Sequence, residues 1–235
     1  MAEMALGYGS EYQLLRFLGH HRNFLNNEIL KQTGIEGVIE WEDYPSDSKR
    51  LSLDGEFKGI EFLKNYPDYA SIKAKWKNFW PQSGNSQNWD GIFYCNKVIY
   101  LVEAKAHLET NSLKSELESD CGAENADSKK HIDEAFEKTR EFFGIKAVND
   151  WTKKYYQQAN RLAFIYFLNE ICGIKAELVN IFFINGYDTK ENDYGVTSEA
   201  EWKAAIKDEY DYLGLTDRAK FVIHEVFIDC KCKLY

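Results

Sequence analysis

The sequence predicts an α/β fold in which a central mixed β-sheet is flanked by helices on both faces. Three observations predict it: a β-hairpin pattern across residues 91–104, buried strand patterns at 176–185 and 221–230, and helical apolar periodicity around them. Both faces of the hairpin are apolar away from its open end, as a sheet between two helical layers requires. No internal repeat or long linker is evident, so residues 1–235 are expected to form a single domain.

Helical and extended patterns alternate before the hairpin. Apolar residues recur at helical spacing through residues 10–31, with Ser10 as N-cap, Gly34 just past the end and a break expected near Gly19. Asp68 is in position to cap a helix that follows it. The other elements expected here are a short strand at 37–42 and helices at 59–65 and 68–79.

Polar and apolar segments also alternate after the hairpin. Residues 108–130 are polar and are interpreted as an insertion or mobile flap, after which Asp127 or Ser128 caps a helix that ends near Gly144. Asp150 caps the next helix, whose second half is apolar nearly all round and is therefore expected to be buried between layers. The elements expected from there on are a helix at 151–172, a strand at 176–185, a helix at 198–208 and a strand at 221–230.

The hairpin carries the most specific information in the chain. Residues 91–95 and 98–104 are rich in β-branched and aromatic residues, and residues 96–97 between them suit a turn. Counting outward from a two-residue turn places Asp90 opposite Glu103. A four-residue loop keeps this pairing, whereas a three-residue loop shifts it by one.

The predicted register brings charged groups together at the open end of the hairpin. Because side chains alternate along a strand, Lys105 and His107 fall on the same face as Glu103, with Asn88 across from Lys105. Opposed acids on neighbouring strands have Cβ atoms roughly 5 Å apart and repel each other. Three arrangements could offset the repulsion between Asp90 and Glu103: a divalent cation between them, protonation of one acid, or neutralisation by Lys105.

Carboxylate oxygens with positions left open for water and phosphate suit Mg²⁺ or Mn²⁺ better than zinc. Asp90, then twelve residues, then Glu103-Ala104-Lys105 at the end of an apolar strand resembles the PD-(D/E)XK nuclease superfamily, also called restriction-endonuclease-like. The match covers the hairpin closely, although Trp89 stands where the family has proline. The resemblance implies a restriction-endonuclease-like fold, Asp90 and Glu103 as metal ligands, and the backbone carbonyl of Ala104 as a further ligand. It also implies that Lys105 positions or activates the attacking water.

The resemblance directs attention to two helices. A helix before the sheet often supplies a further acid in this superfamily, for which Glu28 and Glu11 are the candidates; an ordinary surface role is the alternative. The helix after the E-x-K strand supplies polar groups, and residues three to four apart in the 151–172 helix share a face. Aimed at the metal site, Arg161 could contact a phosphate. A structural polar network is the alternative. The candidates on this helix are Tyr156, Gln157, Asn160 and Arg161.

A polar loop at residues 81–88 leads into Asp90 and is a candidate for substrate contact. The alternative is a turn cluster that hydrogen-bonds to itself. The donors and acceptors of the loop are Gln82, Ser83, Asn85, Gln87 and Asn88. His107 is a further candidate for substrate contact, with a capping role at the strand end as the alternative.

Charge and composition restrict the function classes. The formal net charge of -9 disfavours a protein that coats nucleic acid, although a local basic groove would still bind one. The 68–79 helix carries lysines beside Trp76 and Trp80, which could stack bases or simply pack in the core. Five scattered cysteines are interpreted as reduced thiols.

Several common classes have no motif here. The chain has no G-x-x-x-x-G-K-[ST] phosphate loop, no G-x-G-x-x-G turn after a strand and no G-x-S-x-G elbow. No apolar run is long enough to span a membrane, and no basic region followed by an apolar stretch opens the chain, so a cytoplasmic protein without membrane contact is expected.

The sequence thus predicts a metal-dependent phosphodiesterase that cleaves nucleic acid, with DNA ahead of RNA, through Mg²⁺ or Mn²⁺ held by Asp90 and Glu103. The alternative is a catalytically silent scaffold of the same fold that serves as a protein- or nucleic-acid-binding module. A third reading is a hydrolase of a small phosphorylated molecule. The oligomeric state is left open.

Overall fold

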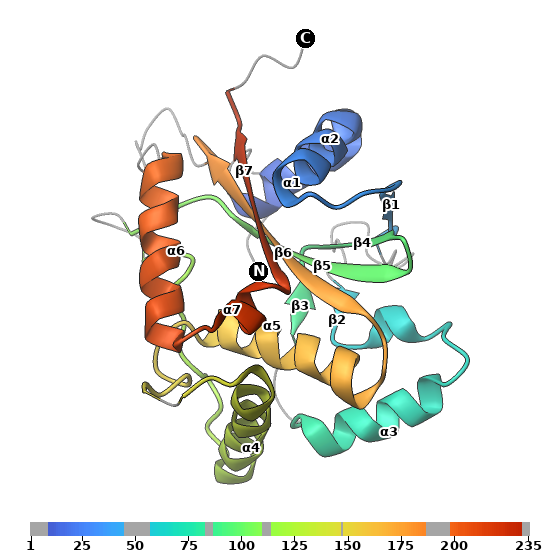
Figure 1. Ribbon diagram of the computed structural model, residues 1–235, viewed down its shortest axis with the longest axis vertical. Helices are drawn as coiled ribbons and strands as arrows, with labels where there is room; N and C mark the ends of the chain where they lie inside the picture. The colour runs from blue at the N-terminus through green and yellow to red at the C-terminus, as the bar shows by residue number, and fades with distance from the viewer. Residues whose placement is uncertain are drawn as a thin grey trace.

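A five-stranded mixed β-sheet forms the centre of the computed structural model, which describes residues 9–44, 57–82, 87–109, 114–146, 148–186 and 198–231. Its strand order is β1-β4-β5-β6-β7 (Figure 1). In that order the strands are Glu40–Trp41, Gly91–Cys95, Val98–Lys105, Ala176–Ile184 and Ile223–Asp229. A separate antiparallel pair joins β2 (Phe57–Lys58) to β3 (Asn88–Trp89). The predicted α/β class with a mixed sheet is confirmed.

The β4–β5 hairpin has the predicted register. The ladder runs outward from the pair of Cys95 with Val98, and every pair agrees with the count from the sequence. Asn96 and Lys97 form the turn with φ angles of 49° and 65°. Positive φ at both turn residues matches the twist of the flanking strands, which is why a two-residue loop fits here. The next residue outward from the ladder on β4 is Asp90.

The pairing of the strands changes from antiparallel to parallel at β5. This strand is antiparallel to β4 and parallel to β6, which is in turn parallel to β7. In open α/β sheets, ligand sites lie beyond the carboxyl ends of the parallel strands, where the strand pattern switches. Because β5 ends at Lys105, the predicted site residues stand at such a position.

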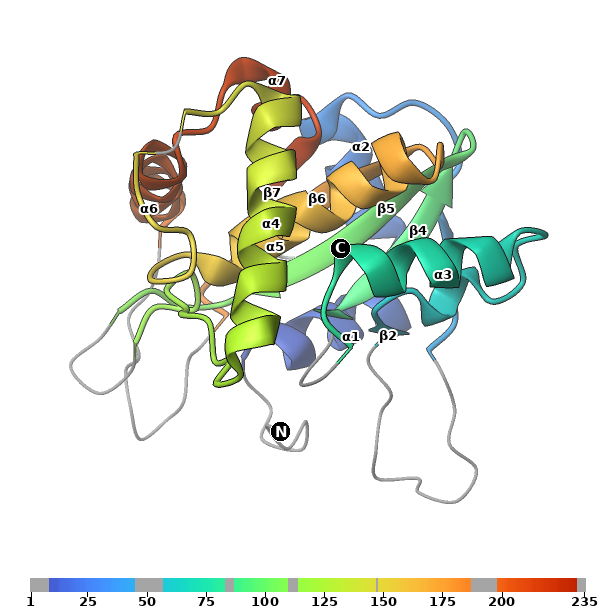
Figure 2. The same cartoon turned by 90° about the horizontal axis from the view of Figure 1, so that it is seen from below.

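Helices cover both faces of the sheet (Figure 2). On one face, Phe17 and Leu25 of α1 and α2 pack with Val102. On the other face, Phe164 of α5 packs with Leu101, and α3, α4 and α6 extend that core. Within the described residues, no helix combines the length and apolar character needed to cross a membrane. The helices are α1 (Ser10–His20), α2 (Arg22–Thr33), α3 (Tyr69–Phe79), α4 (Ala126–Phe143), α5 (Tyr156–Tyr166), α6 (Glu199–Leu213) and α7 (Asp217–Lys220).

The predicted first helix is broken close to the expected position, but its cap differs from prediction. It is two helices that meet at His21, near Gly19. Gly9 precedes the first helix, and the hydroxyl of Ser10 donates to Glu116 at 3.1 Å instead of capping the helix. A long-range contact has therefore taken the side chain that the local pattern assigned to the cap.

Two later helix starts also differ from prediction. Asn125 caps α4, whereas the sequence predicts Asp127 or Ser128 as the cap. The Asn125 side chain accepts hydrogen bonds from the N–H groups of these two residues. The helix that precedes β6 begins only at Tyr156, because Tyr155 adopts a left-handed conformation with φ of 57°. Its last turn, Phe167–Ile171, is a π-helix. The polar residues predicted in the first half of the helix lie in the first two turns of α5.

The tryptophans of the α3 region pack in the core. Trp76 and Trp80 are buried and stack on each other with ring centroids 6.0 Å apart. Trp76 also meets Phe164 of α5 at 5.0 Å. Rings held in this way are not available to stack on bases, so the packing alternative for this segment is confirmed.

Candidate active site

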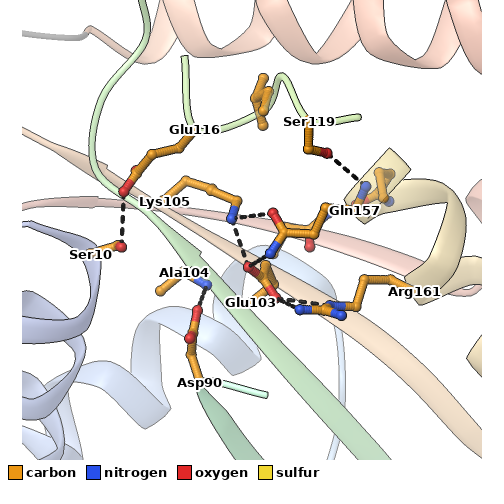
Figure 3. A network of polar contacts seen from close by, with 12 residues as sticks. Ser10, Asp90, Glu103, Ala104, Lys105, Glu116, Ser119, Gln157 and Arg161 are labelled. Carbon is orange, nitrogen blue, oxygen red and sulfur yellow. Dashed lines mark hydrogen bonds and ion pairs between the residues drawn. The ribbon is translucent and has the colours of Figure 1, made fainter. Parts of the chain in front are cut away.

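The open end of the hairpin brings the three predicted site residues together (Figure 3). Glu103 and Lys105 lie on the face of β5 that α5 covers, and Lys105 Nζ donates to Glu103 Oε1 at 2.6 Å. Asp90 lies between β3 and β4, and its Oδ2 accepts a hydrogen bond from the Ala104 N–H at 2.7 Å. The register of the hairpin is the cause of this proximity.

Two side chains of α5 also form hydrogen bonds with Glu103. Gln157 Nε2 donates to Glu103 Oε1 at 2.8 Å, and Gln157 Oε1 accepts from Lys105 Nζ at 2.8 Å. Arg161 donates to Glu103 Oε2 through Nε at 2.9 Å and Nη2 at 2.8 Å. Gln157 and Arg161 reach the same carboxylate because they are one helical turn apart.

Backbone contacts hold the start of α5 over the sheet. The N–H of Gln157 donates to Ser119 Oγ at 2.8 Å, so the segment before α4 satisfies one of the free N–H groups of the first turn. Arg161 Nη2 also donates to the Asn88 carbonyl at 2.6 Å, and its guanidinium lies 4.5 Å from the centre of the Trp89 ring. Arg161 thus links α5 to β3 and β5.

Opposite charges keep Glu103 and Lys105 ionised. Burial would raise the pKa of Glu103, but the charges of Arg161 and Lys105 outweigh burial and hold that pKa below its ordinary value. Burial would lower the pKa of Lys105, but the charges of Glu103, Glu116 and Asp90 raise it overall. Each group therefore stays charged at neutral pH because its partner is charged.

Asp90 is in the opposite situation. Burial and the nearby charge of Glu103 raise the pKa of Asp90 from 3.8 to about 8, against the smaller effects of Lys105, the Ala104 N–H and Arg161. Lys105 and Arg161 are hydrogen-bonded to Glu103, and no positive side chain among the described residues forms an ion pair with Asp90. Without a further cation, protonation of Asp90 and neutralisation of Glu103 by Lys105 together offset the repulsion that the sequence predicts.

The donor set fits a divalent cation in part. Asp90 Oδ2 is hydrogen-bonded, while Oδ1 accepts no hydrogen bond from the residues that the structure describes. A carboxylate oxygen has about two lone pairs, and both oxygens of Glu103 already accept two donors each. Within the described ranges, no three His, Cys, Asp or Glu side chains are grouped so as to hold a metal. A cation would meet Asp90 first and would reach Glu103 only after one of its donors moved away.

The other predicted contact residues have mostly local partners. Asn160 Oδ1 accepts from Arg161 Nη1 at 3.0 Å and so helps to hold the guanidinium. Tyr156 packs edge-on against Phe136. His107 Nε2 lies 3.1 Å from the Lys114 carbonyl, and its backbone N–H donates to Glu116, which agrees with a role at the strand end.

Three predicted residues lie outside this cluster. Glu28 is on α2, where its carboxylate accepts from Gln32 at 2.8 Å and pairs with Lys31, so α2 does not bring it to Asp90. The side chain of Gln82 donates to the Trp80 carbonyl at 2.7 Å, as the self-bonded turn alternative expects. Ser83 lies outside the described residues.

Sequence reasoning missed several residues around the site. Glu116, within the predicted polar insertion, accepts hydrogen bonds from the N–H groups of Ala106 and His107, just beyond the end of β5. Asn180 is buried on β6 in register with Glu103, and an asparagine inside an apolar strand was a usable signal. Glu209 on α6 is also buried nearby, and nothing in the helical pattern distinguishes it from a surface acid.

Comparisons with known proteins add no family. No protein-family model matches this chain, and neither the curated proteins nor the solved structures contain a match. The resemblance to PD-(D/E)XK nucleases therefore stays a prediction that depends on the hairpin and the residues around it.

Proposed function

We propose that the protein is a metal-dependent nuclease that hydrolyses phosphodiester bonds, with Asp90 and Glu103 as ligands of Mg²⁺ or Mn²⁺. The observation that carries this proposal is that the hairpin register brings Asp90, Glu103 and Lys105 together, with Asp90 held by the Ala104 N–H and Lys105 bonded to Glu103. The pKa of Asp90, raised to about 8 by burial and by Glu103, agrees with it. An acid held at such a cost in a constrained position is typical of a functional site.

The chain's own groups have distinct roles in this proposal. Asp90 Oδ1 is the open oxygen through which a cation would first be bound. Gln157 and Arg161 hold the Glu103 carboxylate in one orientation, and one of its hydrogen-bond donors would have to move away before Glu103 could bind the cation. Lys105 carries a positive charge that can stabilise a water nucleophile or a negatively charged phosphate oxygen. The chemistry that a divalent cation supplies in such a site is polarisation of the scissile phosphate and acidification of water.

The test is nicking of supercoiled plasmid DNA by the purified protein with Mn²⁺, Mg²⁺ or Ca²⁺. We expect cleavage with Mn²⁺ or Mg²⁺ and none with Ca²⁺. Asp90→Asn and Lys105→Ala should each lower the rate by about a hundredfold or more, because each removes a charge from the reacting site. Circular dichroism of each variant checks that the fold is intact.

The matched controls are Asp211→Asn and Lys207→Ala, which remove the same charges from an exposed ion pair on α6. Both should cleave at the wild-type rate, since exposed pairs contribute little. Cleavage that persists in both Asp90→Asn and Lys105→Ala would show that the activity belongs to another site or to a contaminant.

One observation favours a second candidate function. Every oxygen lone pair of Glu103 is already engaged, as expected of a structural network in a catalytically silent binding module of the same fold. Calorimetric titration with Mn²⁺ separates the two candidates. A nuclease should bind the ion with an affinity that Asp90→Asn abolishes, whereas a silent module should give no heat of binding.

A further inference from the structure

A small polar cavity borders Glu103 and Lys105, and Asp90 is not among the residues that line it. It is lined by side chains from β5, β6, α5 and α6, and by Leu117. It offers about 10 Å³ to the centre of a water molecule, close to the space that one ordered water requires. The polar side chains that line it are Glu103, Lys105, Gln157, Gln158, Asn180 and Glu209.

Two atoms of this lining are buried without a partner in the described residues: Gln158 Nε2, a donor, and Asn180 Oδ1, an acceptor. The two side chains meet through their other atoms, since Asn180 Nδ2 donates to Gln158 Oε1 at 3.3 Å. Burying a donor and an acceptor unpaired is unfavourable, because each gives up its hydrogen bonds to water without a replacement. The cavity is where a shared partner would remove that cost.

Two further groups at the cavity have unused hydrogen-bonding capacity. The Lys105 ammonium has three N–H donors, of which Glu103 and Gln157 accept two. Glu209 is only 2% exposed, and within the described part of the chain its carboxyl group makes no hydrogen bond. A positive donor and an acid therefore face the same small space as the two unpaired amide atoms.

We propose that one ordered water molecule occupies this cavity and that Glu209, through it, is a positioning residue for Lys105. A water molecule accepts two hydrogen bonds and donates two. It would accept from Lys105 Nζ and Gln158 Nε2 and donate to Asn180 Oδ1 and Glu209. These four groups match its capacity in number and in kind, whereas a cation would be repelled by the ammonium and by the amide donor.

The electrostatics of Glu209 agree with an interaction between its carboxyl group and Lys105. Burial and the charges of Glu225 and Glu103 raise the pKa of Glu209 to about 8, while the charge of Lys105 opposes them. Lys105 is the positive group that acts on this buried acid, and it lies on β5 while Glu209 lies on α6. The water would therefore tie the position of the ammonium to the α6 helix.

The test begins with crystal structures of the wild-type protein and of Glu209→Leu at a resolution that shows ordered water. In the wild type we expect a single density peak within hydrogen-bonding distance of Lys105, Gln158, Asn180 and Glu209. In Glu209→Leu the peak should be absent or the Lys105 ammonium displaced. An empty wild-type cavity, or a variant in which both the peak and Lys105 are unchanged, would overturn the proposal.

The role of Glu209 in catalysis rests on the proposed nuclease function and is measured separately. Glu209→Leu should lower kcat about tenfold or more with KM unchanged, because a displaced catalytic group loses its alignment. Glu209→Gln keeps an acceptor and should stay within about threefold of the wild type. A wild-type kcat in Glu209→Leu would refute the positioning role. A wild-type protein that does not cleave would instead refute the nuclease proposal, and the density peak would still decide whether the water exists.

Discussion

Asp90→Asn should stabilise the protein at alkaline pH. The pKa of Asp90 is raised from 3.8 to about 8, which at about 1.36 kcal/mol per pKa unit corresponds to roughly 5–6 kcal/mol. Asp90 is partly exposed, so water screens its charge, and about half of that value, 2–3 kcal/mol, is the expected gain. Asparagine keeps an oxygen for the Ala104 N–H but carries no charge.

The sign of the pH dependence follows from the raised pKa. The stability that protonated Asp90 contributes is fully present below pH 3.8 and is lost as the pH rises toward 8. Urea denaturation followed by tryptophan fluorescence, at intervals from pH 4 to pH 9, should therefore show Asp90→Asn and the wild type diverging as the pH rises. Asp211→Asn is the control on the surface of α6. If the stability of Asp90→Asn and of the wild type changed in parallel with pH, the raised pKa of Asp90 would be refuted.

Three further predictions concern the site and the core. Arg161→Met should lower the free energy of unfolding by about 3–5 kcal/mol in urea denaturation, because the buried Glu103 carboxylate loses an ion-pair partner. Adding Glu103→Gln to the same chain should restore part of that stability. No recovery would contradict the pairing. Lys105→Met should lower the Kd for Mn²⁺ by about tenfold or more in calorimetry, because it removes a positive charge that repels the cation. Two unit charges 4 Å apart repel by about 4 kcal/mol at an effective dielectric constant of 20. An unchanged Kd would mean that the cation binds elsewhere. Trp76→Ala should cost about 3–5 kcal/mol of stability with no loss of DNA affinity, and the reverse pattern would support base stacking.

Local patterns were sufficient for most of the fold. The hairpin register followed from counting outward from residues 96–97, because a two-residue turn leaves one pairing. The strand at 176–184 is recognisable as an apolar run because it lies between β5 and β7 and is buried along most of its length. The strand at 223–229 lies at the edge of the sheet and is only partly buried, so its position is confirmed but its expected burial only in part. The glycines that follow α2 and α4 marked the helix ends correctly, since Gly34 and Gly144 adopt the left-handed conformation that ends a helix.

Helix starts were predicted less well, since long-range contacts compete for the capping side chains. Ser10 is bound to Glu116, more than a hundred residues away in the chain. The start of α5 depends on Ser119, which accepts from the Gln157 N–H across a tertiary contact. No local pattern contains these partners.

The sequence alone determined which acids and which lysine meet at the end of the hairpin, because two-residue periodicity and a tight turn act over short distances. Only the tertiary structure decided what surrounds them. Arg161 and Gln157 engage Glu103, and Glu209 is buried beside Lys105, because α5 and α6 pack on the same face of the sheet. The charge state of each carboxylate depends on these distant neighbours and on burial, which is why Glu103 stays ionised while the pKa of Asp90 rises to about 8.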